Sequence, residues 1–128
     1  MVLGGAEERP LAEAVARQVE EGCLNLAGRT TLPVLGGVIA RLAVLLTNDS
    51  GPAHLAYALG TPTVTVFGGT DPARWGPPLG RSHRVVSHPV KCQPCDHAAC
   101  LVGSRCLEGV AMPQVVAAAT EVFDDGLR

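Results

Sequence analysis

The stretch AVLLTNDSGPAHLAYALGTPTVTVFGG, residues 43–69, decides the fold that the sequence predicts. Its apolar run at 43–49 ends in polar residues, which is typical of a strand buried on both faces. Residues 52–59 predict a helix, with Pro52 at its first position and Gly60 as its stop. The β-branched run at 61–69 predicts the next strand. This strand–helix–strand order favours a parallel sheet joined by right-handed crossovers.

The flanking sequence repeats the same alternation and places the whole chain in the α/β class. We expect further strands at 1–5 and 23–28, a last strand at 83–87, and helices at 8–21, 31–42 and 112–124. Residues 70–82 are rich in Pro and Gly and predict a loop, and residues 91–110 form a cysteine-bearing excursion. We expect one domain, residues 1–128, with this Cys-rich loop at about 91–110.

Composition excludes several classes of protein. Hydrophobic residues make up 47% of the 128 residues and aromatic residues only 3%, which favours an aliphatic core. The net charge of −2 provides no global attraction for nucleic acid, so no nucleic-acid partner is expected. No apolar run is long enough for a transmembrane segment, and the N-terminus lacks the pattern of a secretory leader. We expect a cytoplasmic protein, with peripheral association at the inner membrane as a further option.

The turn before the 52–59 helix has the features of an anion site. In open α/β sheets, ligands bind at the carboxyl ends of the strands, where unpaired first-turn amides and the helix dipole favour negative charge. Ser50, Gly51, Ala53 and His54 are expected to supply the amides, because Pro52 has none. Asp49 would repel a phosphate, so we expect it to contact a hydroxylated part of the ligand. The alternatives are a structural cap at Asp49 and Ser50, and a structural imidazole at His54.

Four of the five cysteines cluster in the excursion. Cys92, Cys95, Cys100 and Cys106 offer four thiolates, which are suitable ligands for a structural zinc ion or an iron–sulfur cluster. His88 or His97 could replace one thiol as a ligand. The alternative is a set of free thiols, since the second pair is spaced more widely than in a zinc ribbon.

The motifs resemble one family. DSGPAHL at 49–55, GTP at 60–62 and FGGTDP at 67–72 are similar to the signature of glycosyltransferase family 9, the lipopolysaccharide heptosyltransferases. GGAEE at 4–8 and CQPCDHAACLVGSRCLEGV at 92–110 resemble further family segments. The resemblance covers nearly the whole chain.

The resemblance implies a Rossmann-like three-layer domain, the C-terminal half of a GT-B fold. It implies that this half binds ADP-heptose, with Ser50, Gly51 and Ala53 at the diphosphate; the helix-terminus argument adds His54 to the donor-binding residues. It places Asp49 at the heptose hydroxyls and Glu7 at the ribose, and it places Thr70 and Asp71 on a loop near the same cleft. A carboxylate suits vicinal hydroxyls because it accepts two hydrogen bonds at once.

The resemblance also implies what this chain lacks. The family's general base is an aspartate of the N-terminal domain, so no catalytic residue is expected here and the chain alone is expected to be inactive in transfer. The lipid A–Kdo core acceptor would bind through that other domain, and transfer would require no cofactor. The alternatives are a GT-B half that uses another sugar nucleotide, and a non-catalytic nucleotide-binding module.

Overall fold

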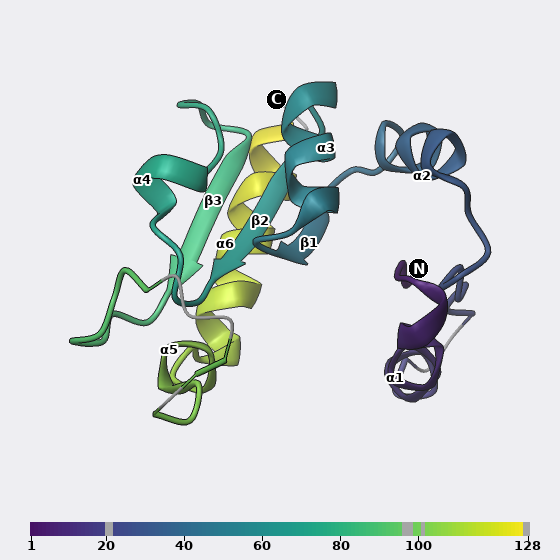
Figure 1. The fold of residues 1–128 in the computed structure, drawn as a ribbon. Helices are drawn as coiled ribbons and strands as arrows, with labels where there is room; N and C mark the ends of the chain where they lie inside the picture. The colour runs from purple at the N-terminus through teal and green to yellow at the C-terminus, as the bar shows by residue number, and fades with distance from the viewer. Residues whose placement is uncertain (20–21, 96–98, 101, 127–128) are drawn as a thin grey trace. The chain divides into compact units, whose positions relative to one another are not determined.

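The computed structural model describes residues 1–19, 22–95, 99–100 and 102–126. The chain divides into two compact units, Met1–Gly37 and Val38–Arg128. The expectation of a single domain stays a prediction. Figure 1 labels the α-helices and strands of both units.

The first unit contains two short helical elements and one β-bridge. The 3-10 turn η1 spans Ala6–Glu8 and α1 spans Arg9–Ala16. The sequence predicts strands at 1–5 and 23–28, but the described residues pair there only through a parallel bridge between Val2 and Asn25. Gly28 has a φ of 64°, and a Cβ on it would lie 2.6 Å from the Cα of Ala6. This close approach explains why glycine stands at that position.

The second unit is built around a parallel sheet. Its strands, in spatial order, are β1 (Leu45–Asn48), β2 (Thr63–Phe67) and β3 (His83–Ser87). Thr63 lies between Leu45 on β1 and His83 on β3 in this register. The α/β class is confirmed, and the three strands match the expected ranges 43–49, 61–69 and 83–87.

Helices cover both faces of this sheet. The long helix α6 (Met112–Gly126) packs on β2 and β3, and α3 (Gly51–Leu59) packs on β1 and β2. Figure 1 shows α6 behind the sheet and α3 in front of it. The remaining helices are α2 (Leu32–Ile39), which spans the division between the two units, and the one-turn helices α4 (Pro72–Trp75) and α5 (Arg105–Glu108).

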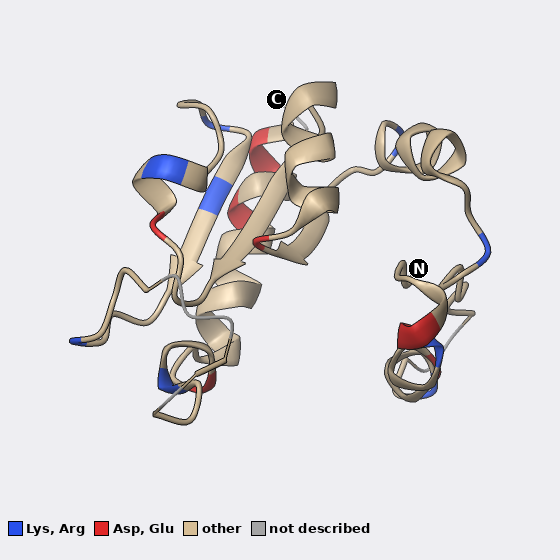
Figure 2. Cartoon of the chain, in the orientation of Figure 1, with Lys and Arg blue, Asp and Glu red and all other residues tan. Residues whose placement is uncertain are grey.

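The two faces of the sheet differ in chemistry because side chains alternate along a strand. On the α6 side, Val64, Val86 and Val122 are buried and form an aliphatic core. Arg84 on β3 also meets this helix, through Glu121 at 3.0 Å and Asp125 at 3.2 Å. Figure 2 shows the acidic segments of α6 beside the basic segment of β3.

The α3 side of β2 carries hydroxyls instead. Thr63 and Thr65 are fully buried there, and both side chains have hydrogen-bond partners. No buried side-chain nitrogen or oxygen in the described part of the chain lacks a partner. Thr63 and Thr65 thus form a buried polar layer on the α3 side of β2.

One expectation for the sheet was wrong. The run at 43–49 predicts a strand buried on both faces, yet Leu46 of β1 is 53% exposed while Leu45 is buried. Leu46 pairs with Val64, so it lies on the α6 side, and α6 packs over β2 and β3. Within the second unit, the α6 side of β1 is therefore less covered than its α3 side.

Candidate functional site

The turn between β1 and α3 lies at the carboxyl end of the sheet, as expected. The Asp49 amide donates to the carbonyl of Val66 at 3.1 Å, which extends the pairing of β1 with β2 by one residue. Ser50 is the N-cap residue of α3. Gly60 ends this helix in the left-handed conformation, with a φ of 71°, so the predicted stop is confirmed.

The amides of this turn are not all available to a ligand. Ala53 donates its N–H to the Ser50 carbonyl at 3.0 Å, and His54 donates to the same oxygen at 3.4 Å. The expectation that both amides are free to meet an anion is wrong for this structure, because the first turn of α3 closes on Ser50. Within the described ranges, the Ser50 and Gly51 amides have no hydrogen-bond partner. These two N–H groups are the ones left for an anion.

The space above Gly51 is open. A Cβ placed on Gly51 meets no described atom within 4 Å. The Ser50 hydroxyl turns back to the carbonyl of Asn48 at 3.1 Å, and its side chain makes no capping hydrogen bond to the amides of α3. The side-chain cap considered for Ser50 is therefore not formed.

Asp49 is nearly buried and is held by two neighbours. Its side chain is 13% exposed, and its Oδ2 accepts a hydrogen bond of 2.6 Å from the Thr70 hydroxyl. Its Oδ1 lies 3.5 Å from Nε2 of His54, whose side chain is 45% exposed. The structure thus brings together three of the predicted site residues, which come from the end of β1, from α3 and from the segment after β2.

A row of rings lies beside this carboxylate. The His54 ring meets Tyr57 edge-on with centroids 5.6 Å apart, and it meets Trp75 at 6.3 Å. Tyr57 in turn meets His83 at 5.5 Å. Edge-to-face contacts of this kind stabilise aromatic pairs. His54 is thereby positioned between two rings.

Two hydrogen bonds join the Tyr57 and His83 side chains to threonines of β2. The Tyr57 hydroxyl and Thr65 lie 2.8 Å apart, and Nδ1 of His83 lies 3.0 Å from the Thr63 hydroxyl. Burial raises the pKa of the Tyr57 phenol; the hydrogen bond with Thr65 opposes this shift and the Asp49 carboxylate adds to it. Burial lowers the pKa of His83 below its ordinary value. Both groups are therefore neutral at physiological pH.

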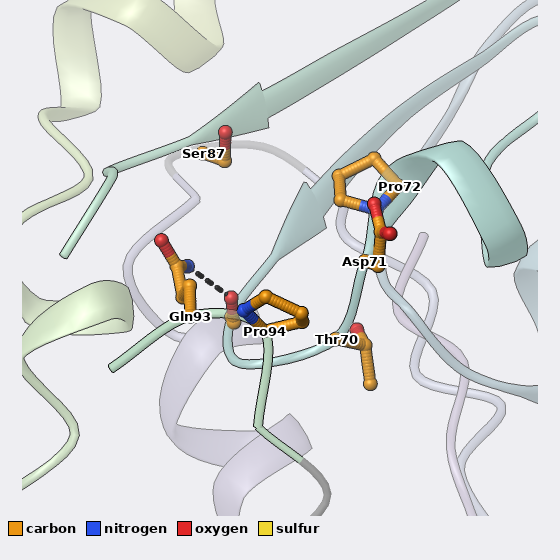
Figure 3. Close-up of a pocket in the computed structure, with 7 residues that line it drawn as sticks. Thr70, Asp71, Pro72, Ser87, Gln93 and Pro94 are labelled. Atoms are coloured by element: carbon orange, nitrogen blue, oxygen red, sulfur yellow. Dashed lines mark hydrogen bonds between the residues drawn. The ribbon is translucent and has the colours of Figure 1, made fainter. Parts of the chain in front are cut away.

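A hollow of about 180 Å³ adjoins the site at the ends of β2 and β3. Asp71, Ser87 and Gln93 face it, together with Thr70 (Figure 3). Asp71 also caps α4, since its Oδ1 accepts from the Ala73 amide at 2.9 Å. The sequence predicts a loop at 70–82, but an acid followed by a proline is a helix-start signal, and α4 begins there.

The loop after β3 is tied to the segment after β2. The Gln93 side chain donates to the carbonyl of Gly68 (Figure 3), and the Cys95 amide donates to the carbonyl of Gly69 at 2.8 Å. A Cβ on Gly69 would lie 2.5 Å from the Cys95 sulfur, so a larger residue there would require the Cys95 side chain to move. Thr70 directly follows Gly69, so the hydrogen bond from the Cys95 amide fixes the backbone next to it.

The four clustered cysteines are all unpaired thiols. Among the described residues, no three His, Cys, Asp or Glu side chains are placed to hold one metal ion. The backbone amides of Ser104 and Val102 donate to the Cys100 sulfur and lower the pKa of that thiol. His97 lies outside the described residues. The zinc or iron–sulfur site stays a prediction.

Glu7 lies in the first unit, within η1. It is exposed, and its neighbour Glu8 accepts a hydrogen bond of 2.6 Å from the Gly5 amide. Its expected ribose contact stays a prediction. The Thr70 to Asp49 contact is the feature that sequence reasoning missed, because only the parallel pairing of β1 with β2 brings these two residues together.

These features define an α/β domain with a candidate anion site at a strand–turn–helix junction. A hollow lined by Thr70, Asp71, Ser87 and Gln93 lies beside this site. The model of glycosyltransferase family 9 (heptosyltransferase) matches residues 1–105. The chain belongs to this family.

Curated relatives include the lipooligosaccharide heptosyltransferase 2 of Haemophilus influenzae, which is 34% identical over 66% of this chain and 25% of the relative. The protein of the same name from Campylobacter jejuni is 29% identical over 88% of this chain and 36% of the relative. This chain therefore spans only about a quarter to a third of the length of these relatives.

Solved structures agree on the fold. The E. coli ADP-heptose lipopolysaccharide heptosyltransferase II superposes with a TM-score of 0.79 at 24% identity, over 98% of this chain and 36% of that one. A family 9 glycosyltransferase from Veillonella parvula gives a TM-score of 0.76 at 23% identity, over 96% of this chain and 36% of that one. No helix in the described part of the chain is long and apolar enough to cross a membrane.

Proposed function

We propose that this chain binds an ADP-activated heptose and is the donor-binding half of a GT-B heptosyltransferase that acts on the lipopolysaccharide inner core. The observation that carries the proposal is the junction at Asp49–Gly51. It combines two amides that have no partner among the described residues, open space above a glycine, and a nearly buried carboxylate one residue before them.

Each part of the junction has a task in this proposal. The Ser50 and Gly51 amides, at the positive end of the α3 dipole, hold the diphosphate. Asp49 accepts hydrogen bonds from hydroxyls of the sugar. Stabilising the diphosphate as it leaves is the contribution this half makes to glycosyl transfer. The base that activates the acceptor comes from outside this chain, and so does the main acceptor site.

The experiment that tests the proposal is calorimetric titration of the folded 128-residue chain with ADP and with ADP-heptose. We expect saturable binding, with the sugar nucleotide binding more tightly than ADP. Gly51→Val should weaken the binding of both ligands at least tenfold, because its side chain fills the open space at the two amides.

Gly80→Val is the matched control. A Cβ on Gly80 also meets nothing within 4 Å, and Gly80 lies in the loop between α4 and β3. It should bind both ligands like the unchanged chain. Equal affinity of Gly51→Val and Gly80→Val for ADP would rule out the junction as the diphosphate site. Tighter binding of another sugar nucleotide would favour a different donor.

A further inference from the structure

We infer that Thr70 is a positioning residue, which fixes the Asp49 carboxylate for the donor sugar without itself donating to that sugar. The inference rests on the proposed function and refines the role of one residue in it. It starts from the Thr70 hydroxyl, which donates to Asp49 Oδ2 at 2.6 Å. A threonine hydroxyl has one proton to donate, and in this structure the hydrogen bond to Asp49 uses it.

The orientation of Asp49 follows from this hydrogen bond. An ionised carboxylate has about four acceptor positions on its two oxygens. Thr70 occupies one on Oδ2, and His54 lies 3.5 Å from Oδ1. At least two positions remain, enough for the two hydrogen bonds that a pair of vicinal hydroxyls donates. A fixed carboxylate loses less freedom when it binds such a pair, so the Thr70 hydrogen bond favours sugar binding.

Thr70 is itself held in place from the other side. The carbonyl of its chain neighbour Gly69 accepts a hydrogen bond of 2.8 Å from the Cys95 amide, and the carbonyl of Gly68 accepts one from the Gln93 side chain. The loop after β3 thus sets the path of the backbone that presents Thr70 to Asp49. Through Gln93 and Cys95, the cysteine-bearing excursion thus supports the site, and this supporting role requires no metal ion.

The test compares Thr70→Val with Thr70→Ser in titrations with ADP and ADP-heptose. Val keeps the shape of Thr and removes the hydroxyl, whereas Ser keeps the hydroxyl. Immobilising one side chain on binding typically lowers an affinity by up to about tenfold. We therefore expect Thr70→Val to reduce the ratio of ADP-heptose to ADP affinity by about tenfold, with ADP affinity unchanged. Thr70→Ser should keep most of the ratio.

A double-mutant cycle distinguishes positioning from a purely structural role. If Thr70 acts through Asp49, then Thr70→Val should cost nothing further in an Asp49→Asn background. Thr70→Ala removes the same hydroxyl with less bulk and serves if thermal denaturation shows that the Val variant is unfolded.

Four results would overturn the inference. An unchanged affinity ratio in folded Thr70→Val, or an equal loss in Thr70→Ser, would exclude a positioning role for the hydroxyl while leaving the proposed function intact. Additive effects in the cycle would mean that Thr70 does not act through Asp49. If the unchanged chain binds ADP and ADP-heptose equally, the sugar contact of the proposed function fails, and this inference fails with it.

Discussion

His83 is a neutral histidine on the α3 side of the sheet, and its neutrality has a consequence for stability. Burial lowers its pKa, and its Nδ1 pairs with the Thr63 hydroxyl. In the unfolded chain the imidazole titrates near a pKa of about 6.5, so below that pH the unfolded state binds more protons than the folded state. The stability contribution of His83 is therefore complete above about pH 6.5 and declines as the pH falls toward its folded pKa.

His83→Gln provides the measurement. We expect the free energy of unfolding of the unchanged chain to decrease more between about pH 7 and pH 5 than that of the variant, as measured by urea denaturation at each pH. The glutamine keeps a hydrogen-bonding side chain beside Thr63 and removes the titration. Parallel pH profiles for the two proteins would contradict this account.

At the same scale, the candidate site was only partly predictable. The Asp-Ser-Gly-Pro motif fixes where α3 begins, because a proline early in a helix and a polar residue before it are local signals. The hydrogen bond from Thr70 to Asp49 is not local, since the two lie 21 positions apart in the sequence. The bond from the His54 amide to the Ser50 carbonyl follows from the position of the cap, whereas the additional bond from the Ala53 amide depends on how tightly the first turn closes.

Among the described helices, α6 packs most extensively on the sheet. Val122 on this helix is 1% exposed and meets Val64 and Val86 of the sheet. Truncating it removes apolar contacts and leaves a cavity in a closely packed core. Val122→Ala is expected to lower the free energy of unfolding by about 2 kcal/mol.

Val116→Ala on the same helix is the control, because Val116 is 56% exposed. It makes the identical chemical change and should shift the urea midpoint little. Equal losses for the two variants would mean that α6 does not pack on the sheet through Val122.

Elements were predicted best where apolar runs are bounded by clear turn signals. Strand β3 has the same bounds, 83–87, as its prediction, and the helix expected at 112–124 corresponds to α6. The run at 1–5 contains two glycines, which disfavour a long strand, and it yields a bridge at Val2 alone. The helix at 8–21 was predicted too long, since α1 ends at Ala16. The prediction ran on because the helical spacing of apolar residues continues past Ala16 and because no helix-stop signal precedes Gly22 in the sequence.

At the scale of the whole molecule, the two units differ in how much core each contains. In the second unit the parallel sheet has helices on both faces and a buried aliphatic cluster. In the described part of the first unit, only Ala12 and Ala27 are buried apolar residues, and one β-bridge forms. Segments of fewer than about 40 residues seldom fold without a staple or a partner.

We therefore predict that a fragment of residues 31–128 folds by itself, whereas residues 1–30 do not. The division after Thr30 keeps α2 intact, including the hydrogen bond of 2.8 Å from the Leu35 amide to the carbonyl of Thr31. Circular dichroism and urea titration should give the longer fragment a cooperative transition, and the shorter peptide should give none. Because Asp49, Gly51 and Thr70 all lie in the longer fragment, its titration with ADP would also show whether the junction binds the nucleotide without Glu7. A longer fragment that unfolds without cooperativity would mean that the core around Val64 depends on residues 1–30.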